Sequence, residues 1–205
     1  MKKMKFFTNF DHEEQWLNEM ARKGHVLVGK SMTYEFAASH PEEANYRIDY
    51  RSFKSRQDFE DYKALFEDSG WMHVAGTKSS GTQYFRQIGT AGNGDIFSDV
   101  DSKAARYKRI SEMWLQLACC FIPLFAVLIS TDVIDVTAFV QPKLLYYTPG
   151  LWDMSGGAFW RAFLFETPFA FFRGFIWLVI PAMILVYAIF AYKAKKQYEK
   201  TQQGR

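Results

Sequence analysis

The sequence predicts an α+β protein, in which a small domain with a ferredoxin-like sheet precedes a membrane unit of two transmembrane helices. The membrane unit is predicted by residues 113–131 and 174–192, two uncharged and strongly apolar stretches of 19 residues each. A helix rises about 1.5 Å per residue, so each stretch matches the roughly 30 Å hydrocarbon core of a bilayer. Residues 1–90 are polar by contrast and contain 13 basic and 13 acidic side chains, which is typical of a water-exposed domain.

Local signals in the first 40 residues predict a strand, a helix and a second strand. Residues 3–8 are expected to form the first, short strand. Asp11 with Glu14 three residues later fits a capping box, and Gly24 is a typical residue just past a helix end. Residues 25–37 are expected to form one strand, because its apolar side chains share one parity and can face one core.

A similar series of elements follows. In residues 45–53, Tyr and Ile alternate with charged side chains, as in a strand buried on one face. Ser55 is expected to cap a second helix that ends at Gly70. Residues 71–76 and 82–88 are expected to form the two strands of a hairpin.

The two halves of the domain resemble each other. Four positions recur at a constant offset of 46, namely Trp16, Met20, Gly24 and Val28 as Tyr62, Phe66, Gly70 and Val74. The resulting order, β-α-β-β-α-β-β, contains the ferredoxin-like arrangement plus one hairpin strand. It predicts one antiparallel sheet with both helices on one face.

The other face of this sheet is the candidate site. Arg47, Asp49 and Arg51 share one parity on the predicted strand 45–53, opposite the side chains that face the core. With both helices on one side, this charged face would be open to a protein, a ligand or a second copy of the chain. The alternative is a solvated surface that only keeps the domain soluble.

The predicted organisation has four parts. These are a cytoplasmic α+β domain at 1–90, a polar and basic linker at 91–109, a membrane unit at 110–192 and a basic cytoplasmic tail at 193–205. Within the membrane unit, residues 132–173 would form an outer loop rich in aromatic residues. Such residues favour the headgroup level, and a site for lipid or another hydrophobic ligand is the alternative.

Basic residues predict the orientation in the membrane. Four precede the first apolar stretch and four follow the second: Lys103, Arg106, Lys108 and Arg109, then Lys193, Lys195, Lys196 and Lys200. The connection at 132–168 contains only Lys143 and Arg161. Because basic residues accumulate on the cytoplasmic side, both termini are expected there, in a multi-pass protein of the cell membrane.

No catalytic, cofactor-binding or metal-binding residues are expected. The histidines are scattered, and the serines lack the context of a known nucleophile motif. Cys119 and Cys120 lie together inside the first apolar stretch and are interpreted as small apolar residues. The domain at 1–90 has no net charge, which argues against binding of nucleic acid.

Several blocks of residues 5–88 together resemble a known family. They are Phe6-Phe7, Glu14-x-Trp16-Leu17-x-x-Met20-Ala21-x-x-Gly24, Tyr46-x-Ile48-Asp49-Tyr50, Leu65-Phe66-Glu67-Asp68-x-Gly70-Trp71 and Tyr84-Phe85-Arg86. The chain resembles the uncharacterised bacterial family called domain of unknown function 2812, many members of which carry C-terminal membrane spans. The resemblance implies a regulated role at the cell envelope without enzyme activity, and it assigns no functional residues.

Two functions remain open from the sequence. The first is a membrane protein whose cytoplasmic domain senses or binds a partner, with the bilayer, a protein partner or a second copy as its contacts. The second is an accessory subunit of a membrane transporter. A subunit that packs against other helices needs small residues on one face, and the first apolar stretch does not decide this point.

Overall fold

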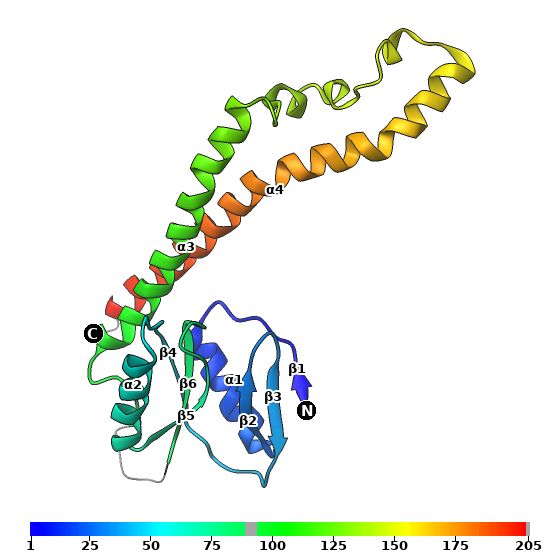
Figure 1. The fold of residues 1–205 in the computed structure, drawn as a ribbon. Coiled ribbons are helices and arrows are strands. Elements are labelled where there is room, and N and C mark those ends of the chain that lie inside the picture. The colour runs from blue at the N-terminus through cyan, green and yellow to red at the C-terminus, as the bar shows by residue number, and fades with distance from the viewer. Residues whose placement is uncertain (89–93, 204–205) are drawn as a thin grey trace. The chain divides into compact units, whose positions relative to one another are not determined.

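The computed structural model describes residues 1–88 and 94–203 and divides the chain into two compact units (Figure 1). The first, here called the α/β unit, contains Met1–Glu112 together with the chain from Phe190 onward. The second, here called the apolar unit, contains Met113–Ile189.

The α/β unit contains two three-stranded antiparallel sheets and two short helices. The sheets have the strand orders β1-β3-β2 and β4-β6-β5. The elements are β1 (Lys2–Lys3), α1 (Phe10–Arg22), β2 (His25–Lys30), β3 (Tyr34–Ala38), β4 (Tyr46–Tyr50), α2 (Arg56–Asp68), β5 (Trp71–Ala75) and β6 (Thr82–Gln87). The α+β class is therefore confirmed.

Several details of the predicted sheet are wrong. The first strand, expected at 3–8, is only the two-residue β1 at Lys2–Lys3. The single strand expected at 25–37 is a hairpin of β2 and β3, which turns at residues 31–33 and pairs His25 with Ala38. The buried residue of β2 is Leu27, whose parity is opposite to that of the buried Tyr34 and Phe36 of β3, so one shared parity could not describe both strands. The expected single sheet is also two sheets, although β2 and β5 lie next to each other.

The internal repeat is confirmed by the structure. Each half contains a strand, a helix and a hairpin, and in both sheets the last strand lies between the other two. Helices α1 and α2 both have 13 residues and begin 46 positions apart. Each helix is followed by a glycine with positive φ, +77° at Gly24 and +81° at Gly70, a conformation that glycine adopts readily.

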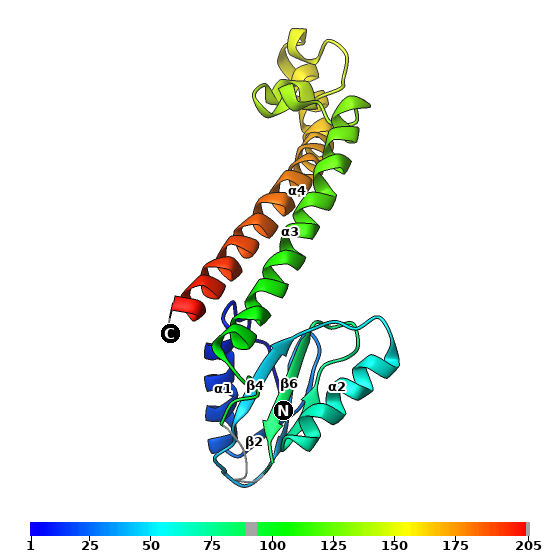
Figure 2. The ribbon, with the colours of Figure 1, turned by 90° about the vertical axis from the view of Figure 1, so that its left-hand side faces the viewer.

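The helices cover opposite faces of the second sheet, so the prediction of both helices on one face is wrong (Figure 2). Neighbouring residues of β6 show this arrangement. Tyr84 belongs to the core cluster of α1, whereas Phe85 belongs to the cluster of α2, which also contains Phe59 and Trp71. Successive side chains of a strand point to opposite faces, so a strand that is apolar at both positions needs a cover on each face.

The α/β unit also contains one end of each of two long helices. Helix α3 (Val100–Ser130) begins here, and its Ala104 and Tyr107 are buried. Helix α4 (Gly156–Gln203) ends here, and Ser111 Oγ of α3 donates a hydrogen bond of 2.9 Å to the carbonyl of Ala191. Residues 100–109 are thus helical and partly buried, which corrects the prediction of a polar linker over 91–109; residues 89–93 lie outside the described part.

The apolar unit consists of the remainder of α3 and α4 and three short 3₁₀ helices between them. These are η1 (Val136–Phe139), η2 (Pro142–Leu145) and η3 (Leu151–Asp153). The outer loop is shorter than predicted, since α4 begins at Gly156 and includes the aromatic residues up to 173. Within the unit, the ring of Trp114 stacks on that of Tyr187 with 5.5 Å between centroids.

Both long helices contain a segment that is long and apolar enough to cross a membrane. Only 6% of the most apolar window of α3 and 11% of that of α4 are buried inside the structure. The core helix of a water-soluble protein would be mostly buried, so these apolar side chains need a cover other than this chain. This is what helices in contact with lipid require.

Candidate functional site

The three residues of the predicted face are not on an open surface. Asp49 is only 4% exposed, and Arg47 has a side chain that is 20% exposed. Helix α2 covers this face near Asp49, where Tyr62 donates a hydrogen bond of 2.9 Å to its carboxylate. Arg51 lies just past β4 and stays exposed, with its guanidinium 5.6 Å from the ring centroid of Tyr62. The prediction of a free charged face is therefore wrong. It assumed that α2 lies on the same face of the sheet as α1, whereas α2 covers the face that contains Asp49.

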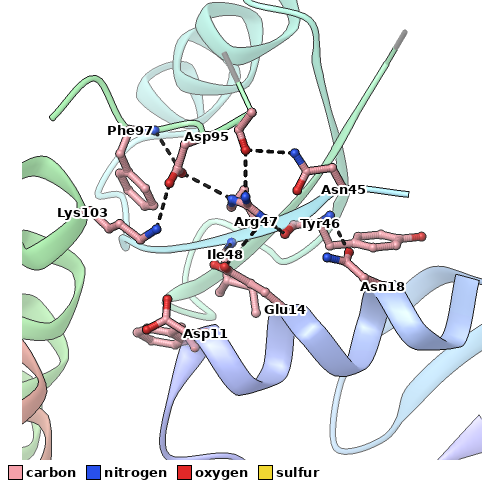
Figure 3. Close-up of polar contacts among 12 residues, drawn as sticks. Asp11, Glu14, Asn18, Asn45, Tyr46, Arg47, Ile48, Asp95, Phe97 and Lys103 are labelled. Carbon is pink, nitrogen blue, oxygen red and sulfur yellow. Dashed lines mark hydrogen bonds and ion pairs between the residues drawn. The ribbon is translucent and has the colours of Figure 1, made fainter. Parts of the chain in front are cut away.

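Arg47 instead holds the segment that leads into α3 (Figure 3). Its Nη2 donates a hydrogen bond of 2.7 Å to the carbonyl of Gly94, and its Nε lies 3.4 Å from the carboxylate of Asp95. Asp95 also accepts a hydrogen bond of 2.8 Å from Lys103 in the first turn of α3. Figure 3 shows Arg47 pointing from β4 between this segment and Glu14 of α1.

The centre of the site is Arg106 of α3, whose side chain is fully buried. Its Nη1 lies 2.5 Å from Glu14 and donates a second hydrogen bond of 2.7 Å to the carbonyl of Ile48. Its Nη2 donates a hydrogen bond of 2.7 Å to Asp11, which is 42% exposed at its side chain. One arginine thus joins α1, β4 and α3.

Aromatic rings enclose this guanidinium. The rings of Phe10, Phe97 and Tyr107 lie 5.1–5.2 Å from its central carbon, a distance at which a cation is attracted to the ring face. The hydroxyl of Tyr107 bonds to Asn9 and Asp11 at the start of α1. These apolar groups shield the guanidinium of Arg106 from water, which makes its contact with the buried Glu14 stronger than an ion pair at a surface, whereas Asp11 stays partly exposed.

Arg109, one turn further along α3, makes the second connection. Its Nη2 lies 2.5 Å from Asp49, and its Nε donates a hydrogen bond to the carbonyl of Tyr50. Asp49 therefore links α2, through Tyr62, with α3. Together, Arg47, Arg106 and Arg109 and the carboxylates of Asp11, Glu14, Asp49 and Asp95 are called the arginine network below.

Burial and charge have opposite effects on the ionised groups of this network. Burial raises the pKa of Glu14, and the charge of Arg106 offsets part of that rise. Burial alone would lower the pKa of Arg106, but Glu14, Tyr107 and Asp11 raise it overall. An arginine keeps its proton in any case, so the buried positive charge needs an ionised Glu14 beside it.

Glu13, the neighbour of Glu14, is a second buried carboxylate with a different environment. Its Oε1 accepts hydrogen bonds of 2.6 Å from both Tyr34 and Tyr84. Burial raises the pKa of Glu13, and these two hydrogen bonds, together with Lys30, lower it only in part. The charge state of Glu13 in this core therefore depends on pH.

Glu13 gives a testable pH dependence. Because its pKa is raised in the folded state, the folded chain binds the proton more tightly than the unfolded chain. Protonation of Glu13 therefore stabilises the folded state. The effect is fully present below 4.5, the pKa of Glu13 in the unfolded chain, and is lost as the pH rises through its pKa in the folded chain. We therefore expect Glu13→Gln to gain stability relative to the wild type as the pH rises from 4 to 7, by about 1.4 kcal/mol per unit of pKa difference.

The measurement is thermal unfolding of the full chain in mild detergent at a series of pH values. Glu19→Gln, an exposed position on the same helix, is the matched control and should follow the wild type. Parallel profiles for Glu13→Gln and the wild type would contradict the assignment.

Sequence reasoning found Arg47 and Asp49 but missed Glu14, Arg106 and Arg109 as members of the site. The two arginines of α3 were interpreted only as charges beside a membrane span. A signal was present, because Ala104, Tyr107 and Ile110 recur every three residues and predict a helix face that packs against the domain. Among the described residues, no group of three His, Cys, Asp or Glu side chains could hold a metal ion.

Comparison with known proteins gives the family. No curated protein and no solved structure matches the chain. The family model described as "Protein of unknown function (DUF2812)" matches residues 9–119. The match continues beyond the resemblance seen at 5–88 and includes Arg106 and Arg109 of α3, so the arginine network lies within the segment that the family model describes. The chain belongs to this family of proteins of unknown function.

Proposed function

We propose that this protein is a multi-pass protein of the cell membrane whose cytoplasmic α/β unit is a non-catalytic module for sensing or binding a partner. The membrane assignment is supported by the exposed apolar windows of α3 and α4. The arginine network fits a structural role, because its charged groups are engaged with one another and with backbone carbonyls. Such groups stabilise a structure and are poorly available to a substrate.

The observation that carries the proposal is the burial of Arg106. Helix α3 is one helix from Val100 to Ser130, so the residue held by Asp11 and Glu14 belongs to the helix that enters the apolar unit. An event that moves α1 or β4 must act on Arg106, because its partners lie on both elements. Through this connection, the binding of a partner to the domain can be transmitted to a membrane helix.

The helix ends that belong to the α/β unit support the placement of both termini on one side of the membrane. The start of α3 and the end of α4 belong to the same compact unit, so the chain must leave and re-enter it on one side of the bilayer. The exposed Lys193, Lys195 and Lys196 then favour the cytoplasmic side. The basic residues of α3 that precede its apolar stretch contribute less, since Lys103, Arg106 and Arg109 are ion-paired.

Cysteine labelling tests the orientation with a matched pair of exposed serines. In a background with Cys119→Ala and Cys120→Ala, we expect Ser155→Cys to react with a membrane-impermeant maleimide in intact cells. Ser39→Cys should react only after the cells are permeabilised. The reverse pattern would contradict the topology, and reaction of both positions in intact cells would contradict a cytoplasmic domain.

The accessory-subunit function is favoured by one observation. An open apolar hollow of about 450 Å³ runs along α4, lined by Phe175, Leu178, Val179, Ala182, Met183, Val186 and Tyr187. A neighbouring membrane helix could occupy it as well as lipid chains. Purification in mild detergent with mass measurement separates the two functions, because a stable stoichiometric complex with other membrane proteins would favour the subunit, and a particle of this chain alone would favour the module.

A further inference from the structure

Two apolar side chains between β1 and α1 are unusually exposed. Met4 is 84% and Phe6 is 73% exposed, although the chain on either side is held in place. The N-terminal amino group of Met1 donates a hydrogen bond of 2.6 Å to the carbonyl of Phe36, and β1 pairs with β3. Phe7 packs against the ring of Trp16. The exposure of Met4 and Phe6 therefore belongs to an ordered segment.

The contact of Phe6 indicates where this segment lies. Its ring centroid is 6.0 Å from that of Phe190, and both residues belong to the α/β unit. Phe190 is near the end of the apolar stretch 174–192 of α4, three residues before Lys193. If α4 spans the membrane, Phe6 lies at the depth where that helix leaves the hydrocarbon.

The charges of the segment complement a membrane surface. Lys2, Lys3 and Lys5 surround Met4, and no acidic residue occurs before Asp11. Lys2 pairs with Glu35 at 2.6 Å, and Lys5 lies over the rings of Phe7 and Trp16. Basic residues beside exposed apolar side chains are the combination that binds an interface of anionic lipids.

We propose that residues 1–7 form a second membrane contact, in which Met4 and Phe6 enter the interfacial region and the lysines bind anionic headgroups. This inference rests on the proposed function, because it requires α4 to span the bilayer. The contact holds the α/β unit against the inner leaflet at a point distant in sequence from α3 and α4. The attachment of the α/β unit to the membrane surface then depends on lipid composition, which two membrane spans alone would not produce.

The experiment measures the depth of a nitroxide spin label by its accessibility to oxygen and to a water-soluble nickel complex. Single cysteines replace Met4, Met32 and Ile176 in the full chain without its native cysteines. Met32 is the matched control, since it is a methionine that is 87% exposed on the turn between β2 and β3. The labelled proteins are reconstituted in vesicles of phosphatidylcholine with and without one quarter phosphatidylglycerol.

We expect the Met4 label to be several-fold more accessible to oxygen than to the nickel complex in anionic vesicles, and the Met32 label to show the opposite preference. Replacing Lys2, Lys3 and Lys5 with glutamine should remove the difference between the two lipid compositions. A Met4 label as exposed to water as the Met32 label would overturn the inference. So would dipolar broadening of the Met4 spectrum, which would indicate that a second copy covers the segment.

The Ile176 label separates this inference from the proposed function. Ile176 is 62% exposed within the apolar stretch of α4 and must be accessible to oxygen if that helix spans the bilayer. A lipid-buried Ile176 label with a water-exposed Met4 label would refute only the second membrane contact. A water-exposed Ile176 label would refute the membrane span itself.

Discussion

Replacing Arg106 with methionine should destabilise the α/β unit by about 3–5 kcal/mol, because Glu14 would remain buried without its partner. Methionine keeps most of the volume of the arginine stem, so the loss comes from the charge and its hydrogen bonds. The carbonyl of Ile48 would also lose a donor. Denaturant-induced unfolding of the full chain in mild detergent, followed by tryptophan fluorescence, measures the change.

A double variant identifies the origin of this loss. Glu14→Gln combined with Arg106→Met removes both charges, while the amide oxygen of glutamine can still accept the hydrogen bond from the backbone N–H of Ile48. Removing both partners of a buried ion pair is often near neutral, so most of the loss should be recovered. Lys108→Met, at an exposed position two residues along α3, is the control and should change stability by less than about 0.5 kcal/mol. Equal effects of Arg106→Met and Lys108→Met would show that the network does not hold α3.

Elements with local signals could be predicted from the sequence. The two helices are defined by capping residues and by glycines at their ends, and these interactions involve residues only a few positions apart. Ser55 Oγ, for example, accepts the N–H of Asp58 at 3.0 Å as expected. The first helix begins earlier than predicted. Its N-cap is Asn9 and not Asp11, and the side chain of Asn9 accepts the N–H of Asp11 at 2.8 Å. Asparagine and aspartate have similar preferences for the cap, so sequence alone placed the cap two residues late.

The covering of the sheet could not be predicted from strand parity. Parity showed that Arg47 and Asp49 lie opposite Ile48, but it contains no information on which helix covers which face. The decisive evidence was in another strand, where Tyr84 and Phe85 are both apolar and both buried. A strand with apolar neighbours is buried on both faces, and this indicates a helix on each side of the sheet.

The role of Arg106 was hidden by its position beside an apolar stretch. A basic residue there normally faces water or headgroups and sets the orientation of the span. Its burial depends on Asp11 and Glu14, which are more than 90 residues away along the chain. Partners at such a distance leave no local pattern, so only the apolar spacing along α3 gave any sign that this helix packs against the domain.

Trp71→Ala should be the most destabilising change in the second core cluster, at about 3–5 kcal/mol, because the ring is only 2% exposed. Trp71 packs with Phe59 and Tyr62 of α2 and with Phe85 of β6. Removing the ring would leave a cavity between α2 and the sheet, on the face that contains Asp49. Unfolding by denaturant in mild detergent gives the magnitude.

Leu65→Ala provides the matched control on α2, because Leu65 is 63% exposed and should lose less than about 0.5 kcal/mol. A near-neutral Trp71→Ala would mean that α2 does not cover this face, and the charged face of Arg47, Asp49 and Arg51 would again be a candidate binding surface. A large loss for Trp71→Ala alone would instead leave Arg51 as the member of that trio available to a partner. Arg51→Glu would then test partner binding, since Arg51 is exposed and makes none of the ion pairs of the network, its guanidinium lying 5.6 Å from the ring centroid of Tyr62.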